Sequence, residues 1–239
     1  MINKLPDDVS SAAARMLGTA PGGLAVPNRR DQILDVLRAA VLSGAMEDGV
    51  VYSAPALSAQ FGVSPTPVRE AMITLAREKL ITVAPNKGFV VASPTQRELT
   101  EMLDARLLLE VPMARRVAQD GLSDDDYARL GELADHTLTT AQKGDFIAHV
   151  LADLTFHVEL VGLGGNAEIT EIVRTLRARW RLSGLDSPAK HDVLIHTSEQ
   201  HRELVELIRA KDADAAATLL DEHLRLAGDA WREEAAAQE

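Results

Sequence analysis

The stretch GVSPTPVREAMITLAREKL, residues 62–80, decides the fold. Two prolines follow Ser64, and both fall in what would be the first turn of a helix. N–H groups in that turn have no partner within the helix, so proline is tolerated there, and we expect the Ser64 hydroxyl to cap the helix. The apolar residues then repeat at helical spacing, which predicts a buried stripe of Val68, Met72, Leu75 and Leu80. The opposite side would carry Thr66, Arg69, Ile73 and Arg77.

The neighbouring segments predict two further helices and a hairpin. One helix should run from about Arg30 to Ser43, and a short one in SAPALSAQFG should stop at Gly62. After Leu80, ITVAPNKGFVVAS holds Asn-Lys-Gly (86–88) between two β-branched runs, a pattern typical of a β-hairpin. Three helices and a hairpin predict a winged helix-turn-helix over residues 27–93, with its third helix in the major groove of DNA.

Charge is distributed unevenly along the chain. The net charge of −11 would disfavour a nucleic-acid partner, but residues 27–95 hold seven basic and six acidic residues, a net of +1. Residues 96–239 hold sixteen basic and twenty-eight acidic residues, a net of −12, together with all seven histidines. There is no cysteine, which excludes disulfides and Cys-rich zinc sites. The sequence also lacks a long apolar run and a signal pattern, so we expect a soluble cytoplasmic protein without a membrane partner.

The rest of the chain predicts only helices. Residues 1–26 are rich in Ala, Gly, Pro and Ser and should form a flexible arm, and residues 235–239 a short tail. Between residues 94 and 234 the patterns predict an antiparallel bundle of six or seven helices. Pro112 should kink or divide the first of them. The expected helices cover about 96–119, 123–142, 145–161, 166–183, 187–210 and 212–234.

One constellation in the bundle suggests a metal site. Asp153 and His157 are four residues apart and share a helix face, while His201 and His223 lie on two later helices with apolar neighbours. One carboxylate and three imidazoles facing inward would suit zinc or another divalent transition metal, with positions left open for water or a ligand. The spacing alone is more often that of a surface Asp–His pair and isolated histidines.

Several of these stretches resemble the GntR family of bacterial transcription regulators. GVSPTPVREAMITLAREKLITVAPNKGFVV is similar to the N-terminal signature of that family. LDARLLLEVPMARRVA, ADLTFHVEL and EQHRELVELIRAKDADAAATLLDEHL resemble the FCD ligand-binding domain of its FadR-type subgroup. The resemblance implies a homodimer that binds operator DNA and senses a small molecule, usually a carboxylate. In many members one Asp and three His hold a metal, and these match Asp153, His157, His201 and His223.

The DNA-contacting motif departs from the family at one position. Pro65 stands where the family usually has an arginine, and an arginine there commonly contacts a guanine. The remaining candidates for DNA contact are Ser64, Thr66, Arg69 and, at the hairpin tip, Lys87. Each also has a simpler explanation without DNA. Ser64 could serve merely as a helix cap, and Arg69 could merely pair with an acidic side chain. The operator sequence therefore does not carry over from the family.

Two groups of arginines in the bundle are open to interpretation. Arg106 matches the family's Arg-x-x-x-Glu pattern with Glu110. It either forms an i, i+4 ion pair on a solvated face or binds the carboxylate of an effector. In RTLRARWRLSG (174–184), Arg177 and Arg181 share a helix face, which we interpret as an exposed basic surface, with effector binding as the alternative.

The sequence therefore predicts a mainly α transcription regulator that responds to a ligand. We expect a repressor whose metal is zinc, with nickel or another divalent metal as alternatives. A second hypothesis is a dimer that binds metal or metabolite and has lost specific DNA recognition because of Pro65. A third, a metal-dependent hydrolase or lyase in which the metal activates water, leaves the winged head unexplained.

Overall fold

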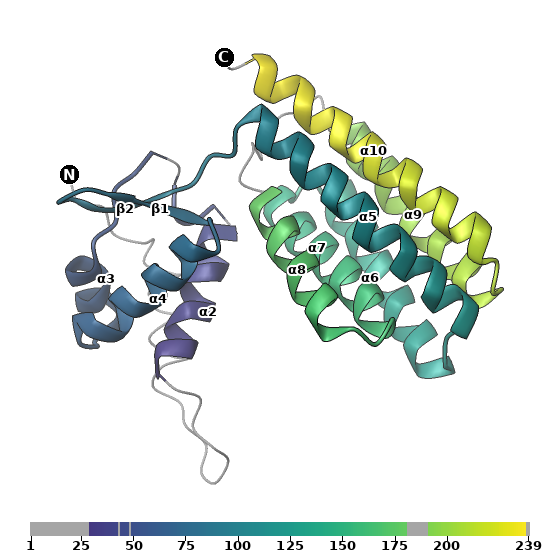
Figure 1. Ribbon diagram of the computed structural model, residues 1–239, viewed down its shortest axis with the longest axis horizontal. Helices are drawn as coiled ribbons and strands as arrows, with labels where there is room; N and C mark the ends of the chain where they lie inside the picture. Colours follow the sequence, from purple (N-terminus) through teal and green to yellow (C-terminus); the bar gives the residue numbers. More distant parts are fainter. Residues whose placement is uncertain (1–28, 43, 48, 181–190, 238–239) are drawn as a thin grey trace, which may run out of the picture. The chain divides into compact units, whose positions relative to one another are not determined.

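The chain divides into two compact units between Ser93 and Pro94, and each is described by itself (Figure 1). The computed structural model describes residues 29–42, 44–47, 49–180 and 191–237. Nine helices and one two-stranded hairpin lie in these residues, which confirms the mainly α prediction. The arm expected at 1–26 and residues 238–239 of the expected tail lie outside them.

The first unit is the predicted winged helix-turn-helix. The first two helices lie within one residue of their expected positions, and Gly62 ends the second with a left-handed φ of 65°. The third helix begins at Pro65 and ends at Arg77, three residues before Leu80. Of the predicted stripe, Val68, Met72 and Leu75 are fully buried on the third helix, and Leu80 is buried just after its end. The elements are α2 (Arg29–Leu42), α3 (Ala54–Phe61), α4 (Pro65–Arg77), β1 (Ile81–Ala84) and β2 (Gly88–Val91).

The predicted cap of α4 is wrong in one respect. Ser64 is the N-cap residue, with extended φ and ψ of −70° and 155°, but its side chain forms no capping hydrogen bond. A cap hydroxyl commonly accepts from the N–H of the third helical residue, and here that residue is Pro67, which has none. In α3 the equivalent residue is Ala56, and Ser53 accepts its N–H at 3.3 Å.

The hairpin pairs Ile81 with Val91 and Ala84 with Gly88 in antiparallel register. Its turn is closed by the N–H of Lys87, which donates to the carbonyl of Ala84 at 3.0 Å. Gly88 has a φ of 142°, and a Cβ at this position would lie 2.3 Å from the carbonyl oxygen of Tyr52. Tyr52 exchanges two backbone hydrogen bonds with Phe89, so the chain before α3 pairs closely with the wing.

The second unit is a bundle of six helices within the described residues. Pro112 does not divide the first of them, which runs unbroken from residue 96 to residue 120. Proline leaves the carbonyl of residue 108 without its helical donor, and both Leu108, which is 75% exposed, and Pro112 lie on the exposed side of the helix. The helices are α5 (Gln96–Asp120), α6 (Asp124–Gln142), α7 (Phe146–Leu163), α8 (Ala167–Trp180), α9 (His191–Arg209) and α10 (Ala213–Ala237).

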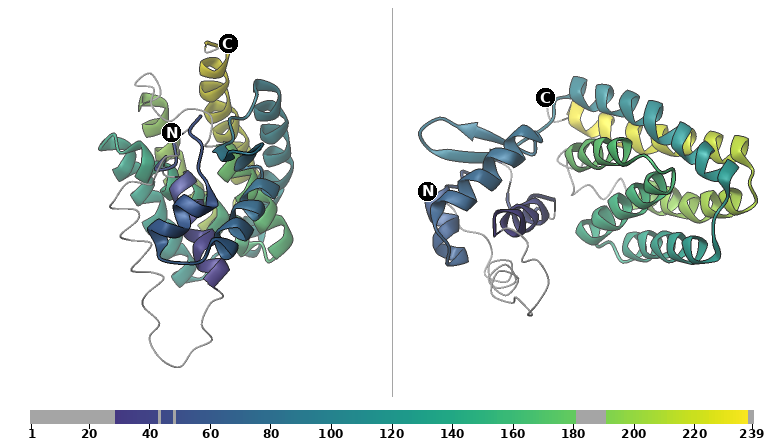
Figure 2. Two further views of the ribbon diagram at one scale, coloured as in Figure 1. Left: turned by 90° about the vertical axis from the view of Figure 1, so that its left-hand side faces the viewer. Right: turned by 60° about the horizontal axis from the view of Figure 1, so that its bottom comes forward.

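Short connections join α6 to α7, α7 to α8 and α9 to α10, and the two helices of each pair pack against each other. Thr95, Ser123 and Asp145 cap α5, α6 and α7, and Thr95 forms a full capping box with Glu98. The last helix lies along the first, as both views of Figure 2 show for α10 (yellow) and α5 (teal). All six helices contribute to one apolar core that includes Leu99, Leu130, Phe156, Trp180, Leu204 and Leu220. In the described residues, no helix is both long and apolar enough to cross a membrane.

Candidate metal centre and nucleic-acid interface

Asp153, His157, His201 and His223 converge inside the bundle. They come from α7, α9 and α10, and one ligand atom from each lies within 4.8 Å of the other three. The Nε2 atoms of the three imidazoles are 3.1, 3.2 and 3.3 Å apart. Asp153 Oδ1 lies 3.6 Å from Nε2 of His157 and of His201. The three rings are almost fully buried, so the arrangement is not that of a surface Asp–His pair.

The spacing of these atoms fits a divalent cation. Nitrogen ligands about 2.0–2.1 Å from a tetrahedral zinc ion lie about 3.3 Å from one another. The three Nε2 atoms already have nearly this separation. A proton on one Nε2 atom can form a hydrogen bond to only one of the other two at a time. A cation at their common point would attract the lone pairs of all three. The donor set of one carboxylate oxygen and three imidazole nitrogens is one that zinc and nickel accept.

The protonation of the cluster also suits a cation. Burial, together with the neighbouring rings of His223 and His157, lowers the pKa of His201 well below its ordinary value. Burial and the ring of His157 do the same to the pKa of His223. Burial alone would raise the pKa of Asp153, but the Arg177 guanidinium brings it well below the ordinary value. At neutral pH the site therefore holds an ionised carboxylate and at least two neutral imidazoles, the protonation states that bind metal.

A buried charge network surrounds the cluster and corrects the prediction for Arg177. This side chain is only 4% exposed, not part of a solvated basic face. Its Nε and Nη2 donate to the carboxylate of Glu110 at 2.6–3.0 Å, and its Nη1 donates to Asp153 Oδ2 at 2.9 Å. Its expected neighbour, Arg181, lies outside the described residues. Its acidic partners, Glu110 and Asp153, lie in the motifs that the sequence singles out, but only the fold shows that they pair with Arg177.

Glu110 connects this network to the candidate metal ligands. The side chain is fully buried, and Arg106 Nε donates to its carboxylate at 2.8 Å. The i, i+4 ion pair that we considered for Arg106 therefore exists, but in the interior rather than on a solvated face. His157 Nδ1 lies 3.2 Å from Glu110 Oε2, close in distance although not aligned as a hydrogen bond. Burial would raise the pKa of Glu110, but the guanidinium groups of Arg177 and Arg106 lower it well below the ordinary value.

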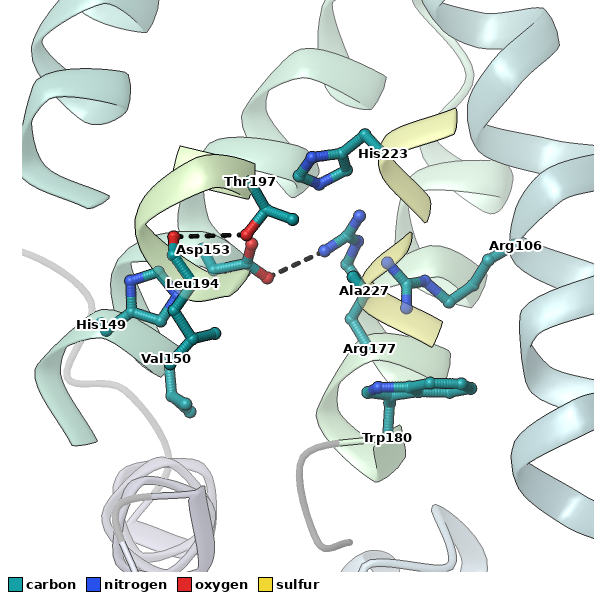
Figure 3. Close-up of a pocket in the computed structure, with 10 residues that line it drawn as sticks. All are labelled: Arg106, His149, Val150, Asp153, Arg177, Trp180, Leu194, Thr197, His223 and Ala227. Carbon is teal, nitrogen blue, oxygen red and sulfur yellow. Dashed lines mark hydrogen bonds and ion pairs between the residues drawn. The ribbon is translucent and has the colours of Figure 1, made fainter. Parts of the chain in front are cut away.

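A small cavity of about 50 Å³ opens beside the ligands, with room for a carboxylate group or a few water molecules. Figure 3 shows Asp153 and His223 at this cavity, with the guanidinium groups of Arg177 and Arg106 directed towards it. The Arg106 guanidinium also lies 5.4 Å from the ring centre of Trp180, a cation–π distance. Apart from its Nε bond to Glu110, Arg106 donates no hydrogen bond to any described residue. Its terminal N–H groups are therefore available to a ligand.

The candidate DNA-contacting residues are exposed on the first unit. Ser64, Thr66 and Arg69 occupy the N-terminal end of α4, and Lys87 occupies the turn of the hairpin. Arg69 makes no ion pair with any described residue, so the simpler explanation, an arginine paired with an acid, does not apply. Ile73 continues the same side of the helix with 39% exposure. This end of α4 thus presents one cation, the exposed acid Glu70 next to it, and several small or apolar side chains.

Comparison with known protein families gives two matches in chain order. Residues 29–91 match the model of the bacterial regulatory proteins of the gntR family, and residues 101–226 match the FCD domain. An uncharacterized HTH-type transcriptional regulator from an unstable DNA locus of Streptomyces ambofaciens is 32% identical over 207 residues, which cover 84% of each chain. The gluconate operon transcriptional repressor of Bacillus licheniformis is 27% identical over 74% of each chain.

Solved structures give the same arrangement of elements. Escherichia coli McbR/YncC superimposes with a TM-score of 0.78 at 24% identity, covering 87% of this chain and 99% of that one. A transcriptional regulator from Rhodococcus sp. RHA1 superimposes with a TM-score of 0.74 at 25% identity, covering 85% and 97%. Both likenesses support the two-unit fold described above.

Proposed function

The chain belongs to the GntR family of bacterial transcription regulators, in the FadR-type subgroup with an FCD domain, and on this premise we propose that it is a repressor controlled by an anionic metabolite. The family consists of DNA-binding regulators and not of enzymes. The observation that carries the proposal is the convergence of four metal-ligating side chains beside a cavity lined by two arginines.

The first unit would bind operator DNA through the N-terminal end of α4 and the wing. Recognition helices of this motif contact base edges with their first residues, and those residues are exposed here. Arg69 is the side chain best suited to a phosphate or a guanine, and Lys87 would contact the backbone beside it. Since Pro65 offers no donor, we expect the operator to differ from those read by relatives with arginine at this position.

The second unit would hold a divalent metal through Asp153, His157, His201 and His223, with zinc as the first candidate. When bound, the metal would supply a Lewis-acidic centre that attracts an anionic ligand group. The charges of this chain's own residues point to the same ligand class. The guanidinium groups of Arg106 and Arg177 balance the carboxylates of Glu110 and Asp153, so a divalent cation gives the site a net charge of about +2. A carboxylate metabolite would neutralise this charge and could accept hydrogen bonds from Arg106.

We further propose that the regulator works as a homodimer in the cytoplasm, where bacterial DNA lies. Two copies related by a twofold axis would present two α4 helices to the half-sites of a near-palindromic operator. A ligand that binds the bundle more tightly in one arrangement of the dimer than in the other would then change operator affinity.

Fluorescence anisotropy with DNA from the gene's own upstream region tests this function. We expect sub-micromolar binding by the zinc-loaded protein, at least about a hundredfold tighter than to a scrambled duplex and weakened by added salt. Gluconate and citrate are then added to test whether a carboxylate releases the protein from the DNA. Gluconate is chosen because some relatives are repressors of gluconate operons. Equal and weak binding to both duplexes would favour the alternative of a metal-binding dimer without specific DNA recognition.

A further inference from the structure

Each imidazole of the candidate metal centre has a second ring nitrogen that faces away from the common point. For His201 this atom, Nδ1, lies 2.9 Å from the hydroxyl oxygen of Thr137 on α6. For His223 it lies 3.2 Å from the side-chain oxygen of Gln200 on α9. These contacts decide which nitrogen of each ring carries the proton, because a neutral imidazole has one N–H and one lone pair.

The Thr137 hydroxyl can only accept a hydrogen bond from His201. Its oxygen lies 2.7 Å from the backbone carbonyl oxygen of Ala134, and a carbonyl has no proton to donate. The single hydroxyl proton must therefore lie between these two oxygens. It is not available to His201, so the ring must donate its own Nδ1–H to Thr137. Nε2 of His201 then carries the lone pair. This is the atom that faces the other two imidazoles.

We propose that Thr137 is a positioning residue of the metal centre, which fixes His201 in the Nδ1–H tautomer and so prepares Nε2 to bind the cation. The Gln200 oxygen acts in the same way on His223, since an amide oxygen also accepts only. Thr137 is fully buried and does not line the cavity, so the effect of its hydroxyl on the site passes through His201. The inference rests on the proposed metal site, and it adds α6 to the helices that support the ligands.

Thr137→Val tests the proposal, because valine keeps the shape of threonine and removes the acceptor. Removing a partner of this kind commonly weakens metal binding by about tenfold to a hundredfold. We expect that loss in the Zn²⁺ affinity of the full-length protein, measured by competition with a chelator. Thr137→Ser retains the hydroxyl and should restore affinity to within about threefold of the wild type.

Thr140→Val is the matched control. Thr140 is buried on the same helix, and its hydroxyl donates to the carbonyls of His136 and Thr137 at 2.9 Å, without contacting an imidazole in the described residues. The same isosteric change at this position should leave the Zn²⁺ affinity within about twofold of the wild type, even if the stability falls as much as in Thr137→Val.

A second measurement reads the tautomer itself. Long-range ¹⁵N–¹H correlation spectra of the metal-free protein should show the proton of His201 on Nδ1 in the wild type and on both nitrogens in turn in Thr137→Val. The proposal is overturned if Thr137→Val keeps either the wild-type Zn²⁺ affinity or the wild-type tautomer. If the wild type binds no Zn²⁺, the proposed metal site fails, and the tautomer in the two metal-free proteins still decides the role of Thr137.

Discussion

Arg177 carries its charge into the interior of the bundle, where it contacts Glu110 and Asp153. A buried ion pair is costly to break, because the partner keeps its charge in a site that water does not reach. Arg177→Met would leave the Glu110 carboxylate with Arg106 as its only cationic partner among the described residues. We expect a loss of about 3–5 kcal/mol in the free energy of unfolding, measured with urea.

Arg174→Met in the same helix provides the comparison. Arg174 pairs with Glu171 at 3.2 Å on the surface, with 45% of its side chain exposed. An exposed pair of this kind contributes little, so the variant should change the free energy of unfolding by less than about 0.5 kcal/mol. Similar small effects of both substitutions would contradict the buried network.

Arg69 is the residue on which the DNA-binding account of the first unit depends most. Its side chain is exposed on α4 and makes no ion pair with a described residue. Arg69→Ala should therefore weaken binding to the upstream DNA by at least about 1 kcal/mol and leave the melting temperature unchanged. Arg116→Ala, the same loss of charge on an exposed side chain of the second unit, should leave the affinity unaltered. Equal affinities of the two variants would count against α4 as the recognition helix.

At the scale of elements, the hairpin depends on a close approach at Gly88. Both its φ of 142° and the 2.3 Å between an added Cβ and the Tyr52 carbonyl oxygen oppose any side chain. Gly88→Ala should weaken the pairing of Tyr52 with Phe89 and speed hydrogen exchange of the Phe89 amide at least about tenfold. Gly62→Ala is the control, because Gly62 also has a positive φ but an added Cβ there would contact nothing. Hydrogen exchange of the wing amides should therefore be as slow in this variant as in the wild type. A wing that exchanges equally slowly in both variants would refute this packing.

The elements themselves were predictable because their signals are local. The stripe of α4, the Gly62 stop and the Asn86–Gly88 turn each depend on residues close in sequence, and the structure has them where the pattern puts them. The Ser64 cap was mispredicted because the general rule for caps takes no account of Pro67 at the donor position. In α5 the general rule for proline predicts a break that the structure does not have, and Pro112 lies there on the exposed side of an unbroken helix.

The site could be predicted only in part, because several of its residues come together only through tertiary contacts. Asp153 and His157 share a helix face by spacing, but their meeting with His201 and His223 required the resemblance to a family. The sequence pattern predicts a surface position for Arg177, because several arginines lie close to it and arginine favours solvent. Its burial depends on Glu110, 67 residues away, and on Asp153, 24 residues away. No periodicity encodes such a pairing.

For the whole molecule, the buried histidines make stability depend on pH when the metal is absent. The pKa values of His201 and His223 are well below the ordinary value of 6.5 that they regain on unfolding. The unfolded chain then binds more protons, so the stability of the bundle should fall as the pH drops below about 6.5. Thermal unfolding of the metal-free protein between about pH 7.5 and 5 measures this. In the double variant His201→Gln/His223→Gln the melting temperature should depend less steeply on pH. An unchanged dependence would mean that other groups cause it.

The central claim is that the bundle holds a divalent metal at the common point of one carboxylate and three imidazoles. Anomalous scattering from crystals of the full-length protein grown with Zn²⁺ tests it most directly. We predict one strong peak per chain, about 2.0–2.1 Å from Nε2 of His157, His201 and His223 and about 2.0–2.2 Å from an oxygen of Asp153. A peak elsewhere, or none at the cluster with zinc in excess, would contradict the account.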